Sequence, residues 1–150
     1  MQNLKMFCIC IHNELLSKVK KINYIPVGLG NNKFDLEWIK DNSGENISEK
    51  NKFYGEYTFH YWFWKNKIKN LSDNDWIGFC AYRRFWLNEK NNCNKNLKFK
   101  DRILSNVPKL WENYQVILGD KIYVDDIKWT KILKYGKISL TKNPRAIFRK

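Results

Sequence analysis

Residues 76–82 read Trp-Ile-Gly-Phe-Cys-Ala-Tyr, and this apolar run decides the fold. A strand with no polar alternation is typical of a sheet that is covered on both faces. Residues 6–11, Met-Phe-Cys-Ile-Cys-Ile, form a second run of the same kind, and residues 24–29 are a third strand candidate. Strands of this type occur in α/β proteins, so the sequence predicts that fold class.

The segment between these runs carries a helical pattern. Its apolar residues fall at positions 53, 57, 61, 64, 68 and 71, and these spacings of three and four predict an amphipathic helix over 52–70. Asn51 is the expected N-cap. A strand, a helix and a strand in this order predict a parallel crossover, with residues 76–82 as a central strand. Residues 30–51 are rich in turn formers and predict a long loop, whereas a weak helix is expected over 103–111 and a strand over 114–118.

The composition limits the class of protein. The chain of 150 residues is 43% hydrophobic and 16% aromatic, which excludes a disordered chain and predicts one domain. The net charge of +13 raises nucleic acid as a partner. However, residues 128–150 hold eight of the 28 basic residues and no acidic one, and the abundance of Lys, Asn and Ile is typical of an AT-rich genome. The chain shows no zinc-ligand spacing, helix-turn-helix or RNA-binding strand motif, so no nucleic acid partner is expected.

The cysteines and the hydropathy predict a cytoplasmic protein. Cys8, Cys10, Cys80 and Cys93 form no C-x-x-C pair and are interpreted as reduced thiols. No apolar run approaches the roughly 18 residues of a membrane span, and the run at 6–11 is too short for a signal peptide.

Candidate ligand-binding residues follow the predicted strands. Ligands of parallel α/β sheets collect beyond the carboxyl ends of the strands, where His12, then Tyr82-Arg83-Arg84, and finally Asp120 are expected. Paired arginines suit a diphosphate because each guanidinium offers a planar fork of donors to phosphate oxygens. The chain holds only five arginines among many lysines, which favours a specific role for this pair over a solvated surface.

Acidic residues provide two candidate cation sites. Asp73-Asn74-Asp75 matches the D-x-D pattern of nucleotide-sugar transferases, but it precedes its strand and is interpreted as a turn at the amino edge. Asp120, Asp125 and Asp126 are better placed to bind Mg²⁺ or Mn²⁺, with a solvated loop as the alternative. His60 shares a helix face with Glu56, and a packing role is favoured for this histidine.

Three blocks of sequence resemble one bacterial family. They are the loop 41–51, the helix residues Glu56, Thr58, Tyr61-Trp62 and Trp64-Lys65-Asn66, and the strand residues Asp75, Ile77-Gly78 and Tyr82-Arg83-Arg84-Phe85. In order and spacing they resemble the domain-of-unknown-function 4422 family, glycosyltransferase-like proteins found among capsule and exopolysaccharide genes. Ala81 stands where this family usually has a histidine. Family domains are also longer, so the chain resembles the amino-terminal part of one.

The resemblance implies an enzyme that transfers a sugar from a nucleotide-diphosphate donor to a glycan or lipid-linked acceptor of surface polysaccharide (capsule, exopolysaccharide or lipopolysaccharide). The implied scaffold is a GT-A-like, partly parallel sheet with crossover helices over 1–127, incomplete at the carboxyl end. No organic cofactor is implied. Glu56 is the candidate catalytic base. The candidate substrate-binding residues are His12, Asn42, Gly44, Asn46, Ser48, Tyr82, Arg83 and Arg84. Two alternatives are a non-catalytic, truncated fragment of such an enzyme and a basic nucleic-acid-binding module.

The basic segment 128–150 has two interpretations. Its apolar residues alternate with lysines, which suits peripheral contact with an anionic membrane at the inner face of the cytoplasmic membrane. Alternatively, these apolar residues pack against a missing carboxyl-terminal half of the domain.

Overall fold

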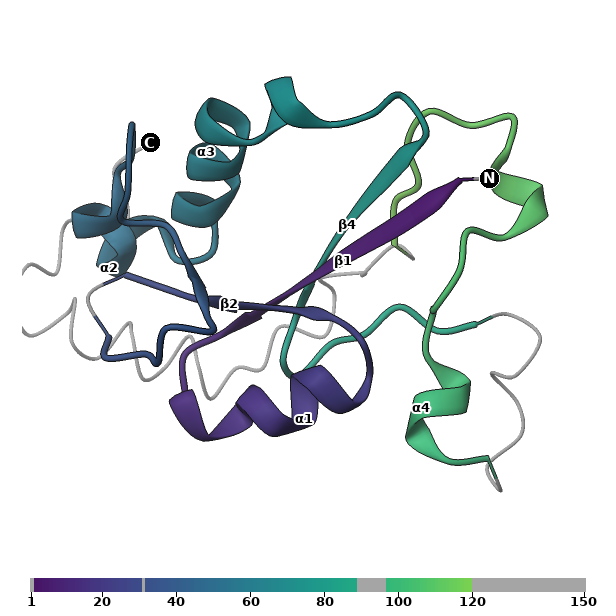
Figure 1. The fold of residues 1–150 in the computed structure, drawn as a ribbon, viewed down its shortest axis with the longest axis horizontal. Helices are drawn as coiled ribbons and strands as arrows, with labels where there is room; N and C mark the ends of the chain where they lie inside the picture. The colour runs from purple at the N-terminus through teal and green to yellow at the C-terminus, as the bar shows by residue number, and fades with distance from the viewer. Residues whose placement is uncertain (1, 31, 89–96, 120–150) are drawn as a thin grey trace, which may run out of the picture. The chain divides into compact units, whose positions relative to one another are not determined.

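The sheet defines the architecture of the chain. The computed structural model describes residues 2–30, 32–88 and 97–119, and the chain divides into two units, 1–117 and 118–150, of which the first is described below. Its four strands are β1 (Asn3–Cys10), β2 (Ile25–Gly28), β3 (Ile39–Lys40) and β4 (Asp75–Ala81), in the order β3-β2-β1-β4 (Figure 1). Every pairing is parallel. The predicted α/β class is confirmed, and the sheet of the described residues is wholly rather than partly parallel.

Residues 76–82 were predicted as a central strand, which the sheet of the described residues does not show. Among the described residues β4 is an edge strand, and β1 lies inside the sheet, where Phe7 pairs with both Ile25 and Phe79. The burial explains the difference. All of residues 6–10 in β1 are buried, whereas only Cys80 is buried in β4. An apolar run therefore identified two strands of this sheet without ranking their positions within it.

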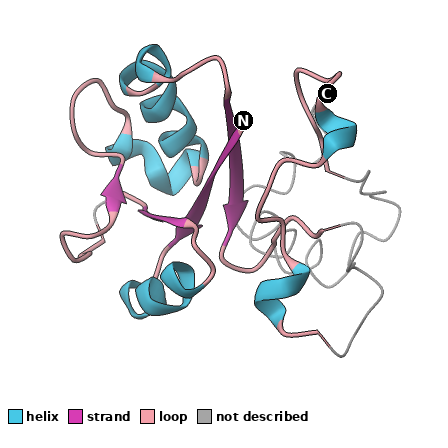
Figure 2. Cartoon of the chain, turned by 45° about the vertical axis from the view of Figure 1, so that its right-hand side comes forward, coloured by secondary structure: helices cyan, strands magenta, loops and turns pink. Residues whose placement is uncertain are grey.

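Helices cover both faces of the sheet. Successive strand residues point to opposite faces, so β1 contributes to two hydrophobic clusters. Its Met6, Cys8 and Cys10 pack with Val19 of α1 (Leu16–Lys21), which follows the short 3₁₀ turn η1 (Asn13–Leu15). Its Phe7 and Ile9 pack with α3 (Tyr57–Asn66) on the other face. Figures 1 and 2 show α1 and α3 on opposite sides of the strands, so the sheet is doubly wound.

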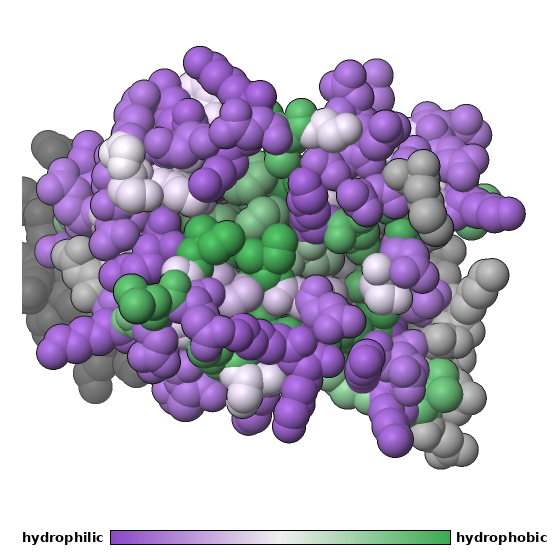
Figure 3. Space-filling view, viewed as in Figure 1, coloured by the Kyte–Doolittle hydropathy of each residue, from purple (hydrophilic) through white to green (hydrophobic). Residues whose placement is uncertain are grey.

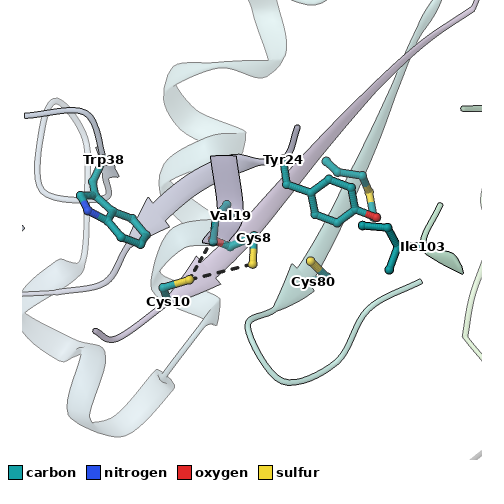
Figure 4. Close-up of a cluster of buried hydrophobic side chains, with 8 residues drawn as sticks. Cys8, Cys10, Val19, Tyr24, Trp38, Cys80 and Ile103 are labelled. Atoms are coloured by element: carbon teal, nitrogen blue, oxygen red, sulfur yellow. Dashed lines mark hydrogen bonds between the residues drawn. The ribbon is translucent and has the colours of Figure 1, made fainter. Parts of the chain in front are cut away.

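The α1 face of the core contains three buried free thiols (Figure 4). The Sγ atoms of Cys8 and Cys10 lie 3.9 Å apart, and the hydrogen bond with Cys8 together with burial raises the pKa of Cys10 far above its ordinary value. The Tyr24 hydroxyl donates a 2.6 Å hydrogen bond to the carbonyl of Leu104, and burial is the main cause of its raised pKa. The reduced-thiol prediction is confirmed for these three cysteines, and Cys93 lies outside the described residues.

The predicted helix over 52–70 is interrupted. It comprises α2 (Asn51–Tyr54), α3 and the 3₁₀ turn η3 (Ile68–Asn70), and the break falls at Gly55, whose φ of +54° suits glycine. Asn51 is not the N-cap, because it is the first residue of α2 and follows the 3₁₀ turn η2 (Ser48–Lys50). Its side-chain amide instead donates to the Gly55 carbonyl at 2.8 Å and to Thr58 Oγ1 at 3.1 Å.

The expectations for residues 103–118 are also wrong. The helix α4 (Phe99–Arg102) ends before this region, Ile103 forms an antiparallel bridge with Leu87, and a 3₁₀ turn, η5, covers Lys109–Trp111 after Pro108. Residues 114–118 form no strand. Tyr114 and Val116 are exposed, and an apolar segment becomes a strand only where a neighbour offers backbone partners.

The hydropathy of the surface is mixed in the view of Figure 3, where hydrophilic residues surround apolar ones near the middle. Within the ranges that the structure describes, no helix combines the length and apolarity needed to cross a membrane.

Candidate functional site

The chain topology has its switch point at the carboxyl ends of β1 and β4. From β1 the chain proceeds through α1 to β2 and on to β3, and from β3 it crosses through α3 to β4 on the opposite side of β1. The two crossovers diverge between β1 and β4. In open α/β sheets such a divergence leaves a crevice just beyond the strand ends, where ligands bind.

Three predicted site residues come together at this crevice. The rings of His12, after β1, and Tyr82, after β4, meet edge to face with centroids 5.7 Å apart. The guanidinium carbon of Arg83 lies 4.9 Å from the centroid of the Tyr82 ring, as in a cation–π contact. The Tyr82 backbone N–H donates to the carbonyl of Ile9 at 3.0 Å, which extends the β1–β4 pairing up to the cluster.

The two arginines occupy a turn at the end of β4. The N–H of Arg84 donates to the Ala81 carbonyl at 2.9 Å, which closes the turn. Both arginine side chains are exposed, and neither forms an ion pair within the described part of the chain. The donors of both guanidiniums are therefore available to an anion.

The loop after β1 is held in place by the residue that follows His12. The Asn13 side chain donates to Asp35 Oδ2 at 3.0 Å and accepts the Asp35 N–H at 3.2 Å. His12 itself is half exposed, and its Nδ1 lies 3.7 Å from Glu14 Oε1. The two hydrogen bonds between Asn13 and Asp35 hold the backbone next to His12 in place.

A buried carboxylate follows β3 and was not among the candidate site residues. Asp41 is fully buried, and it accepts the Gly30 N–H at 3.0 Å and the Thr58 hydroxyl at 2.6 Å. Gly30 has φ +59°, and a Cβ there would come within 3.1 Å of Asn51. Asp41 thus connects β2, β3 and the first turn of α3. The signal for this role is a carboxylate directly after a two-residue strand, and propensity alone gives that pattern little weight.

The predicted donor-binding loop runs along α3. The Ser43 carbonyl accepts the indole N–H of Trp62 at 2.7 Å, and the Glu45 carbonyl accepts the Asn66 amide at 2.9 Å. From Thr58 to Asn66 the helix rises about 12 Å, so the loop follows α3 from its first turn to its last. Gly44, with φ +58°, packs against the Asn66 side chain.

Within the described residues, the hydrogen bonds of the loop predicted to bind substrate are made inside the loop and with α3. The amide of Asn46 donates to the Gly44 carbonyl at 2.9 Å, and its oxygen accepts the Ser48 N–H at 3.2 Å and the Ser48 hydroxyl at 3.0 Å. These bonds engage the polar groups of Asn46 and Ser48 inside the loop. Asn42 is exposed.

Glu56 lies directly before α3 and is exposed. No contact joins it to His12, Tyr82 or Arg83 in the part of the chain that the structure describes. His60, one turn further on, packs against the Phe79 ring with centroids 4.5 Å apart, and burial lowers its pKa while Glu56 opposes this shift. The packing role favoured for His60 is confirmed.

Of the acidic candidates, the structure places only the Asp73–Asp75 turn, which lies at the amino edge of the sheet. Asp75 begins β4 opposite Asn3, at the amino edge, and accepts a 2.6 Å bond from Lys5 Nζ and a 3.1 Å bond from the Ser72 N–H. The bond from Lys5 is the first cause of its lowered pKa. Asp120, Asp125 and Asp126 lie outside the described residues, and the described ranges contain no group of three metal-ligating side chains.

Fold and site together define a doubly wound, parallel α/β protein with an exposed arginine pair at its topological switch point. The chain belongs to the family described as a domain of unknown function, DUF4422, and the match covers residues 6–143. Neither a curated protein nor a solved structure matches the chain.

Proposed function

We propose that this protein is a glycosyltransferase of bacterial surface polysaccharide synthesis that binds a nucleotide-diphosphate sugar at the crevice between β1 and β4. The observation that carries the proposal is the meeting of His12, Tyr82 and Arg83 at the point where the crossovers diverge. Membership of a family that is glycosyltransferase-like supports the same class of reaction.

The arginines have a clear chemical role in such a transfer. When the bond between the sugar C1 and the β-phosphate oxygen breaks, negative charge develops on the leaving diphosphate. Fixed guanidinium groups stabilise that charge, and the Tyr82 ring holds Arg83 in place before the donor arrives. In this proposal the diphosphate lies at the turn of Arg83 and Arg84, and Glu56 accepts the proton of the acceptor hydroxyl.

The metal and the location belong to the same proposal. Mg²⁺ or Mn²⁺ held by Asp120, Asp125 and Asp126 would neutralise the diphosphate further. We place the reaction in the cytoplasm. Residues 128–150, rich in lysine and alternately apolar, would contact the inner face of the cytoplasmic membrane, close to a lipid-linked or glycan acceptor.

Calorimetric titration of UDP and GDP into the full chain tests the proposal. We expect Arg83→Ala and Arg84→Ala to lose about 1.5–3 kcal/mol each, a decrease in affinity of about 10-fold to 150-fold. Arg83→Lys retains the charge but not the planar fork, and it should bind less tightly than wild type. Lys69→Ala, which removes an exposed positive charge beyond the end of α3, is the control. Unchanged affinity of both alanine variants for every diphosphate that binds would refute the assignment.

A further inference from the structure

A cavity of about 560 Å³ lies between α1, the residues after β4, and α4. Figures 1 and 2 show these three segments as neighbours. The volume falls within the roughly 300–1,000 Å³ of small-molecule sites. The apolar side chains that line the cavity are Leu15, Val19, Ile22, Tyr82, Phe85 and Phe99.

The remaining lining residues are all cationic. They are Lys18 and Lys21, three positions apart on α1, and Lys100 on α4. Within the described ranges, none of the three forms an ion pair and no acidic side chain lines the cavity. By contrast, Lys20 of the same helix does not line the cavity and forms an ion pair with Glu37. The cationic residues at the cavity are therefore available to a ligand.

This combination defines the chemistry of the ligand. Apolar walls favour a hydrocarbon or ring, and they penalise a buried polar group that has no partner. Three ammonium groups with no compensating acid favour an anion such as a phosphate. A ligand that satisfies both has an apolar body and a single anionic end.

The cavity adjoins the crevice through a shared residue. Tyr82 lines the cavity and also contacts His12 and Arg83. Phe85, three positions later, stacks edge-on with Phe99 of α4 at 5.1 Å and closes the opposite wall. A molecule in the cavity would therefore lie beside the proposed diphosphate site without occupying it.

We propose that this cavity binds an amphiphilic phosphate, with its hydrocarbon chain against the apolar walls and its phosphate at Lys18, Lys21 and Lys100. The site goes beyond the proposed sugar transfer and does not depend on it. The ligand is a single molecule that enters the cavity, rather than the surface of a bilayer.

Monomeric alkyl phosphates test the proposal directly. Titration of hexyl, octyl and decyl phosphate into the full chain, below their aggregation concentrations, should show affinity rising about fourfold for each added methylene. Inorganic phosphate and decanol should each bind at least tenfold more weakly than decyl phosphate. Affinity that does not depend on chain length, or binding only to phosphatidylglycerol vesicles, would overturn the proposal.

Matched variants separate the two parts of the ligand. Lys18→Ala/Lys21→Ala/Lys100→Ala should weaken decyl phosphate binding at least tenfold. The control Lys33→Ala/Lys69→Ala/Lys109→Ala removes the same charge from exposed sites away from the cavity and should leave binding unchanged. Phe99→Ala, at a half-exposed ring, should weaken decyl phosphate more than hexyl phosphate. Equal binding by both triple variants would contradict the assignment.

The same proteins distinguish this site from the diphosphate site. UDP affinity should be unchanged in the Lys18/Lys21/Lys100 variant, and decyl phosphate affinity should be unchanged in Arg84→Ala. Loss of both ligands in either variant would show a single site and overturn the proposal of a separate cavity. Far-ultraviolet circular dichroism and the urea midpoint of each variant verify that it is folded.

Discussion

The imidazole of His12 meets the ring of Tyr82 at an interplanar angle of 90°, with centroids 5.7 Å apart. These residues follow β1 and β4, whose parallel pairing brings distant parts of the chain to one edge. The contact lies where the crossovers diverge, and the guanidinium of Arg83 lies beside the same Tyr82 ring. The functional proposal depends on this juxtaposition.

The buried Asp41 should depend on its hydroxyl donor for stability. Thr58→Val keeps the shape of the side chain but removes the 2.6 Å hydrogen bond, so Asp41 retains only the Gly30 N–H. We expect a loss of about 1–3 kcal/mol in the free energy of unfolding, measured with urea. Thr58→Ser retains the hydroxyl and should lose less. A valine variant as stable as the wild type would show that the carboxylate does not need this donor.

Two glycines with positive φ should respond differently to alanine. Gly44 and Gly55 both have φ near +55°, which strains an alanine at either position, and Gly55 combines this φ with ψ −130°. At Gly44 the added Cβ would also overlap Asn66 Oδ1, whereas at Gly55 nothing lies within 4 Å. The Asn66 amide is held by bonds to the carbonyls of Glu45 and Trp62 at 2.9 and 2.8 Å, so it cannot move freely.

Gly44→Ala should therefore destabilise the wild type more than it destabilises an Asn66→Ala background, in which the overlap with Asn66 is removed. Urea midpoints of the wild type, the two single variants and the double variant test this coupling. Equal losses in the two backgrounds would mean that the loop is not anchored on α3 as described.

The sequence predicted the strands better than their arrangement. Continuous apolar runs identified β1, β2 and β4, because burial on both faces is a local property of composition. The sequence did not reveal that β1 is an interior strand, since that position depends on which strands pair. Gly55 interrupted the predicted helix because periodicity does not report a positive φ.

The candidate site was predicted to a similar extent. The predicted strand ends indicated that His12 and Tyr82 lie close together, because all carboxyl ends of a parallel sheet share one edge, and the two rings are in contact. The α1 helix was not predicted, although Leu15, Val19 and Ile22 have helical spacing. The cavity beside it depends on α4, which lies far along the chain, and no local pattern predicts such a contact.

Stability should decrease below neutral pH because of His60. Burial lowers the pKa of this imidazole below its ordinary 6.5, so the unfolded chain binds a proton that the folded chain does not. The free energy of unfolding therefore falls as the pH drops below about 6.5. His60→Phe should reduce this dependence between pH 7 and 5.5. If the free energy of unfolding of His60→Phe changed with pH as much as that of the wild type, the assignment would be contradicted.

The most direct test of the account is the map of amide chemical-shift changes when UDP or GDP is added to the ¹⁵N-labelled chain. The account predicts that the largest changes occur at His12, Asn13 and Tyr82–Arg84, at the carboxyl ends of β1 and β4. The turn Asp73–Asp75 at the amino edge should change little. Largest changes at Asp73–Asp75, with His12 and Tyr82 unaffected, would contradict the central claim that a nucleotide diphosphate binds in the crevice between β1 and β4.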